Sequence, residues 1–262
     1  MELKSGIYES LIYEALKRKL ETLSDKYVFT DSIDSGEAPK LLTNYVAKII
    51  NSLLSDDSLF ETLEGRFKFV NDILNYIDKN WQCDIDDSLL TNQEELLSGI
   101  VDMAGLTKEQ AKQRVTMRPL SGFTISNLFT GSNTDLSIDG EIERDIQTAD
   151  EIYWIVAFVR FSGVRIFENA LCEFLTKPNA KLRLITTTYM GASEPKAVDF
   201  LKQLAPDKVE IKVSYNCDLD RLHAKSYIFV RESGMNTAYI GSSNISRSAL
   251  TKGLEWNMRI TN

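Results

Sequence analysis

The stretch "HAKSYIFVRESGMNTAYIGSSN", residues 223–244, contains the single histidine of a chain of 262 residues. Its two β-branched and aromatic runs, "AKSYIFV" and "TAYIGS", flank a turn that contains Ser-Gly and Asn, a pattern that predicts a β-hairpin. Side chains two residues apart on a strand point to the same face, so we expect His223 and Lys225 side by side. The returning strand ends in "GSSN", where Gly241 permits a close approach of two backbones.

The "GSSN" end of the hairpin supplies two hydroxyls and an amide at the start of a predicted helix, "SRSAL". Helix N-termini favour bound anions. Glu255, in the expected strand "GLEWNMRI", brings a carboxylate that can orient an imidazole. Together these groups supply a nucleophile, an electrostatic clamp, an amide donor and an orienting base. The predicted catalytic residues are therefore His223, Lys225, Asn244 and Glu255.

Four further residues are predicted to bind the substrate, namely Ser242, Ser243, Arg247 and Arg160. Arg160 follows the first strand of the expected α/β region, and ligands of open α/β sheets bind at such strand ends. Arg247 lies in the first turn after "GSSN", where it can contact a phosphate. Both residues also have an alternative interpretation without substrate binding. Arg160 can belong to an ordinary loop connection, and Arg247 can be a solvated helix residue.

Strands alternate with helices throughout the second half of the chain. The runs "EIYWIVAFV", "KLRLITTTY" and "KVEIKVSYN" have strand character, and "VRIFENALCEFLTK" and residues 195–204 between them have helical spacing. Such alternation predicts an α/β domain over residues 141–262, with a mixed, largely parallel sheet flanked by helices.

The first half has a different period. Apolar residues recur at steps of three and four in residues 6–23, in "PKLLTNYVAKIINSLL", in "LFETLEGRFKFVNDILNYI" and in "NQEELLSGIVDMA". We therefore predict an all-α N-terminal domain over residues 1–116, a helical bundle with a structural role in packing, capping or connecting other parts of the protein. Residues 117–140 are rich in Ser, Thr, Asn and Gly, which indicates a connector.

Charge is unevenly distributed along the chain, whose net charge is −8. Residues 1–145 hold 15 Lys and Arg against 26 Asp and Glu, a net of −11, whereas residues 146–262 hold 15 against 12, a net of +3. The second half can therefore approach a polyanion.

Three scattered cysteines argue against a disulfide framework and a metal site, and no cofactor is expected. Without a signal-like or membrane-spanning apolar run, we expect a cytoplasmic protein that does not enter a membrane.

The hairpin resembles the signature of the phospholipase D superfamily, H-x-K, four residues, D, a spacer and G-S-x-N. The matching residues are His223, Lys225, Gly241, Ser242 and Asn244, and Glu255 resembles the carboxylate of the nuclease members. Two departures stand out. Val230 occupies the place of the aspartate, which is regarded as structural in the superfamily, and the spacing from Lys225 to Gly241 is longer than usual.

The resemblance extends over most of the chain. "YESLIYEALKRKL", "LFTG", "IVAFVRFSG" and "LITTTYMGASEPKAVDFL" are similar to the N-terminal region of bacterial DEAD/DEAH-type helicases that carry a phospholipase D-like domain ahead of their motor. None of the 13 glycines precedes a lysine, so these residues contain no P-loop. The chain ends seven residues after Glu255, and we expect a helicase motor downstream in a longer polypeptide.

The resemblance implies a metal-independent phosphodiesterase, a nuclease that cleaves through a phosphohistidine on His223. A second histidine protonates the leaving oxygen, and a chain with one histidine must take it from a homodimer partner that shares the active site. The implied substrate is nucleic acid, with DNA favoured over RNA. One alternative is a non-catalytic DNA-binding and dimerisation module of a helicase. Another is a site that has drifted so that only dimerisation remains.

Overall fold

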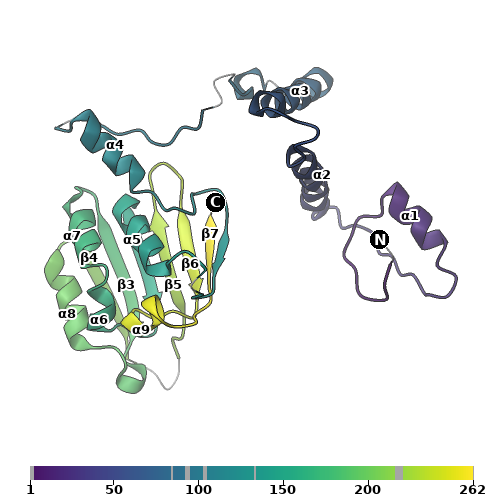
Figure 1. Cartoon of the computed structure of the whole chain (residues 1–262). Coiled ribbons are helices and arrows are strands. Elements are labelled where there is room, and N and C mark those ends of the chain that lie inside the picture. The colour runs from purple at the N-terminus through teal and green to yellow at the C-terminus, as the bar shows by residue number, and fades with distance from the viewer. Residues whose placement is uncertain are drawn as a thin grey trace. The chain divides into compact units, whose positions relative to one another are not determined.

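The computed structural model describes residues 3–83, 85–91, 95–102, 105–132, 134–215 and 221–261. Its internal contacts form two compact units, Met1–Leu97 and Ser98–Asn262 (Figure 1). Both boundaries expected from the sequence, after residue 116 and after residue 140, fall within the second unit. The domain boundaries therefore stay a prediction.

The first unit contains helices, as its sequence pattern predicts, but the helix expected over residues 6–23 forms only over residues 14–21. It consists of α1 (Glu14–Glu21), α2 (Ala38–Leu54), α3 (Leu63–Trp81) and the 3-10 turn η1 (Asp86–Ser88). The hydroxyl of Thr62 caps α3 by accepting a hydrogen bond from the Gly65 N–H at 3.1 Å. Within the described residues of this unit no side chain is fully buried, so the apolar stripe of α2, which includes Leu42 and Val46, is half exposed.

One predicted helix is wrong. "NQEELLSGIVDMA" spans residues 92–104, and the described part, residues 95–102, has no regular structure. Ser98 and Gly99 in its centre both favour non-helical backbone. Helix α4 (Lys108–Thr116) begins after it, with a capping box between Thr107 and Gln110.

The second unit is built on a seven-stranded sheet with the order β1-β7-β6-β5-β2-β3-β4. Its strands are β1 (Asn127–Phe129), β2 (Glu151–Val156), β3 (Lys181–Thr187), β4 (Val209–Ser214), β5 (Lys225–Val230), β6 (Thr237–Gly241) and β7 (Asn257–Thr261). Its other helices are α5 (Ile138–Thr148), α6 (Phe161–Val164), α7 (Glu168–Thr176), η2 (Tyr189–Gly191), α8 (Pro195–Leu204) and α9 (Arg247–Thr251).

The mixed α/β fold expected from the sequence is confirmed, but the sheet is not largely parallel. Only the β2–β3 and β3–β4 pairs are parallel, and the other pairs described in the sheet are antiparallel. Helices connect β2 to β3 and β3 to β4, as parallel pairing requires. After β4 the chain places β5 antiparallel beside β2, and β6 and β7 then follow as antiparallel neighbours. The expected connector supplies β1, which pairs with β7 at the sheet edge.

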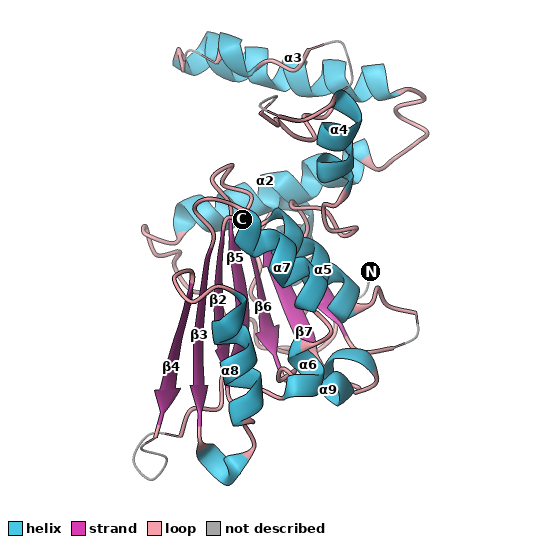
Figure 2. Ribbon diagram, turned by 90° about the vertical axis from the view of Figure 1, so that its left-hand side faces the viewer, coloured by secondary structure: helices cyan, strands magenta, loops and turns pink. Residues whose placement is uncertain are grey.

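Helices α5 to α9 lie on one face of the sheet (Figure 2). Residues Ile152, Trp154 and Val156 of β2 point to this face and are inaccessible to solvent. They alternate with partly exposed residues, as expected for a strand with one covered face. The core therefore lies between the sheet and these helices, and it fixes the strand ends that carry the polar side chains described below.

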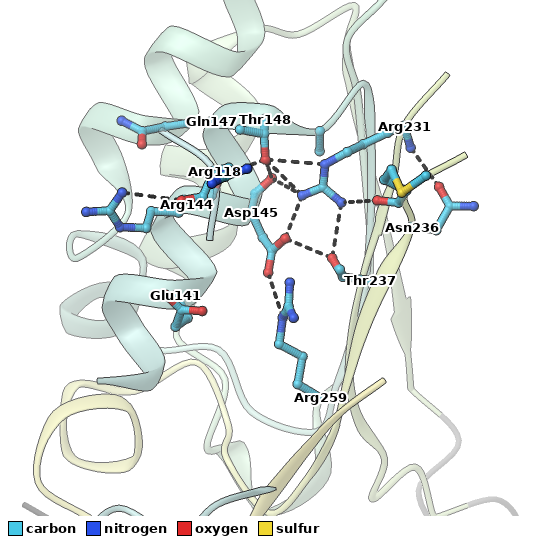
Figure 3. A network of polar contacts seen from close by, with 12 residues as sticks. Arg118, Glu141, Arg144, Asp145, Gln147, Thr148, Arg231, Asn236, Thr237 and Arg259 are labelled. Carbon is cyan, nitrogen blue, oxygen red and sulfur yellow. Dashed lines mark hydrogen bonds and ion pairs between the residues drawn. The ribbon is translucent and has the colours of Figure 1, made fainter. Parts of the chain in front are cut away.

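A buried ionic network joins α5 to the far end of the β5–β6 hairpin (Figure 3). The carboxylate of Asp145 accepts hydrogen bonds from Arg231 at 2.5 Å, Thr237 at 2.8 Å and Tyr239 at 2.7 Å. Arg259 Nε lies 3.5 Å from the same carboxylate. Burial raises the pKa of the Tyr239 hydroxyl, so Tyr239 stays protonated and donates. One charged group thus ties the helix to β6, to β7 and to the residue that follows β5.

Candidate active site

The β5–β6 hairpin forms as predicted, with Ser226 opposite Ile240 and Tyr227 opposite Tyr239. His223 lies just before β5 rather than on it, and it is exposed. The carbonyl of Ala224 accepts a hydrogen bond from the Ala157 N–H at 3.0 Å, which fixes this segment beside the end of β2. His223 is therefore held at the carboxyl end of a central strand, where its ring faces solvent.

Lys225 lies against His223, as the two-residue spacing predicts. Its Nζ is 3.0 Å from Nδ1 and 3.1 Å from Nε2 of the imidazole, and it donates to the His223 carbonyl at 2.8 Å. Only 7% of Lys225 is exposed. Burial lowers the pKa of its ammonium, while the negative charge of Glu255 raises it. The hairpin thus places a buried ammonium directly against the exposed imidazole.

Asn244 is positioned by the loop that follows β2. Its Oδ1 accepts a hydrogen bond from the Phe158 N–H at 3.0 Å, which assigns the side-chain oxygen and leaves the amide nitrogen as a donor. The Phe158 ring contacts the His223 ring edge-on, with centroids 6.5 Å apart. Phe158 therefore brings the imidazole and the amide to one place. Sequence reasoning missed it, because an apolar residue after a buried strand carries no chemical signal.

Two glycines allow the loops of the site to approach closely. A Cβ on Gly241 would lie 2.1 Å from the Trp256 carbonyl oxygen, and a Cβ on Gly163 would lie 2.5 Å from the Ile245 carbonyl carbon. Real Cβ atoms do not approach so closely, so glycine is required at both positions. The close approach expected at Gly241 is thus present in the structure.

The serines of "GSSN" hold the loop. Ser243 is fully buried, and its hydroxyl accepts a hydrogen bond from Asn257 at 2.8 Å. Ser242 is exposed, but its hydroxyl accepts the Trp256 N–H at 3.0 Å. The burial of Ser243 favours a positioning role for it over the predicted contact with substrate. Ser242 keeps an exposed hydroxyl at the edge of the site, and its substrate contact stays a prediction.

Arg160 and Arg247 come from two neighbouring segments. Val159 and Ile245 form a parallel bridge, and the Arg160 N–H donates to the Ile245 carbonyl at 2.8 Å. Arg160 precedes α6, Arg247 begins α9, and both side chains are exposed. The bridge joins the segment that carries Arg160 to the segment that carries Asn244 and Arg247.

Glu255 lies in the segment between α9 and β7, rather than in the expected strand. Its charge acts on Lys225 and on the hydroxyl of buried Tyr227, whose pKa rises through burial first and through Glu255 second. Tyr227 consequently stays protonated and donates to the Ser243 carbonyl at 2.9 Å. In the described part of the chain, no hydrogen bond joins Glu255 to His223. Its orienting role stays a prediction.

Comparison with known proteins bears on the same region. Residues 142–262 match the family described as "Cardiolipin synthase, PLD-like domain". No curated protein matches the sequence. Among the described residues, no helix is long and apolar enough to cross a bilayer, and no group of three or more His, Cys, Asp or Glu residues is arranged to hold a metal ion.

Three solved structures match part of the chain at low sequence identity. NucT from Helicobacter pylori is 13% identical, with a TM-score of 0.41, covering 52% of this chain and 84% of NucT. Nuc from Salmonella typhimurium, a phospholipase D family member, is 17% identical, with a TM-score of 0.39, covering 53% of this chain and 84% of Nuc. Yeast tyrosyl-DNA phosphodiesterase is 12% identical, with a TM-score of 0.31, covering 43% of this chain and 26% of the enzyme.

Proposed function

Because residues 142–262 match a phospholipase D-like family, we propose that this chain is a metal-independent nuclease acting through a phosphohistidine. One observation carries the proposal: the buried Lys225 ammonium lies 3.0 Å from His223 Nδ1, beside an exposed imidazole. A cation held at that distance stabilises negative charge on a phosphoryl group that bonds to the ring.

The proposed reaction has two steps. In the first, a ring nitrogen of neutral His223 forms a bond to phosphorus, the P–O bond to the leaving strand breaks, and a second histidine protonates the leaving oxygen. In the second, water attacks phosphorus, the second histidine takes its proton, and the P–N bond breaks. Lys225 and the amide nitrogen of Asn244 stabilise the charge of the five-coordinate phosphorus. Glu255 supports the positive charge that Lys225 needs, and it is the proposed orienting carboxylate.

A covalent intermediate is expected on His223. A short oligonucleotide with radioactive phosphate, mixed with the protein and quenched in alkali within the first turnover, should leave label on one tryptic peptide. Phosphohistidine survives alkali and is lost in acid, so a matched acid quench should release the label. Label on any other residue, or turnover with no protein-bound label at any quench time, would contradict the phosphohistidine step.

The second histidine must come from another copy of the chain, because each chain has one. We therefore propose a C2 homodimer in which two His223 side chains meet. The exposed position of His223 before β5 supports this, because among the described residues its side chain is accessible to a partner. Activity per chain should fall on dilution, together with the dimer peak in light scattering. A protein that stays monomeric at micromolar concentration and cleaves at full rate would exclude the shared site.

Nucleic acid is the proposed substrate, with DNA favoured, and the net charge of +3 in residues 146–262 supports a polyanionic ligand. Tight binding of single-stranded DNA with no turnover after long incubation would favour the alternative, a DNA-binding module. A helicase motor in the full-length protein stays a prediction, which sequencing of the complete gene tests.

A further inference from the structure

An exposed arginine and a partly buried tyrosine form a stack beside the proposed active site. The Arg221 guanidinium lies over the Tyr189 ring, with Cζ 4.1 Å from the ring centroid. Arg221 is exposed, and among the described residues its guanidinium makes no ion pair. A guanidinium stacked on an aromatic ring keeps its outer face and its charge available to a ligand.

Hydrogen bonds fix the loop that carries the tyrosine of the stack. Arg221 lies two residues before His223, in the segment that enters β5. Tyr189 follows β3, and its N–H donates to the Thr187 hydroxyl at 3.1 Å. Farther along the same loop, the Glu194 N–H donates to the Val159 carbonyl at 2.8 Å. The loop with Tyr189 is thus bonded to the loop that positions Asn244.

The backbone next to Tyr189 is strained. Met190 has φ of 55°, in the left-handed region that non-glycine residues rarely occupy, and 76% of its side chain is exposed. Such strain persists only where surrounding contacts enforce it, and it clusters at ligand sites. Neither burial nor core packing accounts for it here. The strained residue sits between the stacked tyrosine and Gly191 at the carboxyl end of β3, an edge where ligands of α/β sheets bind.

We propose that the Arg221–Tyr189 stack binds a nucleobase next to the scissile phosphate, which makes the preferred substrate an unpaired strand. This inference rests on the proposed function, since it places the base by the phosphate that His223 attacks. A base can lie on the flat guanidinium or on the tyrosine ring only if it has left the duplex stack. Stacking tolerates any base, so the stack selects single-stranded character rather than sequence.

The chain offers a matched control. Arg183 lies over the Tyr153 ring, with Cζ 5.2 Å from the centroid, within strands β3 and β2 rather than at their carboxyl ends. Changing Arg183 to lysine therefore makes the same chemical substitution in a similar pair away from the site. Changing Arg221 to lysine keeps the charge but loses the flat face, whereas changing Tyr189 to leucine removes the ring.

The test compares two single-stranded oligonucleotides, one normal and one abasic on both sides of the scissile phosphate, so that backbone charge is equal. Binding is measured by fluorescence anisotropy, which does not require cleavage. The normal strand should bind roughly 5- to 150-fold more tightly to the unmodified protein and to Arg183→Lys. Tyr189→Leu and Arg221→Lys should each lose most of this preference. The affinity of Tyr189→Leu for the abasic strand should differ from that of the unmodified protein by less than about twofold, because the charge of the protein is unchanged.

The outcomes separate this inference from the proposed function. Equal binding of normal and abasic strands by the unmodified protein would overturn the stacking site, even if both strands are cleaved. An undiminished preference in both Tyr189→Leu and Arg221→Lys would overturn it as well. A preference that depends on both residues, in a protein that cleaves neither strand, would support the stacking site while the proposed nuclease fails.

Discussion

Changing His223 to alanine should reduce phosphodiester cleavage by roughly 10³- to 10⁶-fold, the loss seen when a nucleophile is removed from an enzyme. No group within the described site can take over. Lys225 is a protonated cation without a free electron pair, and the Asn244 oxygen is occupied by the Phe158 N–H. Initial rates on a labelled oligonucleotide measure the effect.

The fold should survive this change. His223 is exposed and precedes β5, so its removal leaves the hairpin pairs intact. Lys252→Ala is a suitable control, since it removes another exposed side chain from the same unit and should keep the rate within about twofold. Cleavage by the His223 variant within tenfold of the unmodified protein, at an unchanged melting temperature, would show that His223 is not the nucleophile.

Changing Asp145 to asparagine should lower the free energy of unfolding of the second unit by about 3–5 kcal/mol, the cost of removing one partner from a buried ion pair. Asparagine keeps the shape of aspartate but not its charge, so the buried guanidinium groups of Arg231 and Arg259 would lose their counter-charge. Arg259 depends most on this charge, because its guanidinium nitrogens have no hydrogen-bond partner among the described residues. The neighbouring carboxylate of Glu141 accepts hydrogen bonds from the N–H groups of Leu120 and Ser121.

Urea unfolding followed by the fluorescence of buried Trp154 measures this loss, in a background where Trp81 and Trp256 are changed to phenylalanine. Asp150→Asn is the matched control. Its carboxylate accepts the Glu232 N–H at 2.8 Å near the surface, so the same substitution should cost about 1 kcal/mol. Equal losses from Asp145→Asn and Asp150→Asn would show that the buried charge does not hold the network together.

Local pattern explains what could be predicted from the sequence. The alternation in "AKSYIFV" and the turn residues after it predict the hairpin, and the two-residue spacing places Lys225 beside His223. These features depend on residues close in the chain. The sheet was expected to be largely parallel because strands alternate with helices up to β4. The antiparallel placement of β5 beside β2 depends on residues about 70 positions apart, which no local pattern records.

Contacts between residues far apart in the chain also limit how much of the site, and of the buried network around Asp145, can be predicted. Asp145 and Arg231 are 86 residues apart, and so are Phe158 and Asn244. Neither pair has a spacing or composition that would associate its members. The helix expected over residues 92–104 fails for a local reason. Its apolar residues have helical spacing, but Ser98 and Gly99 at its centre have low helix propensity, and the described residues 95–102 are not helical.

The most direct test is cleavage of mixed nucleic acids by the unmodified protein and by His223→Ala, each with and without excess EDTA. A metal-independent phosphohistidine nuclease predicts cleavage by the unmodified protein at the same rate in EDTA, and none by the variant. Cleavage that EDTA abolishes and that His223→Ala retains would contradict the account.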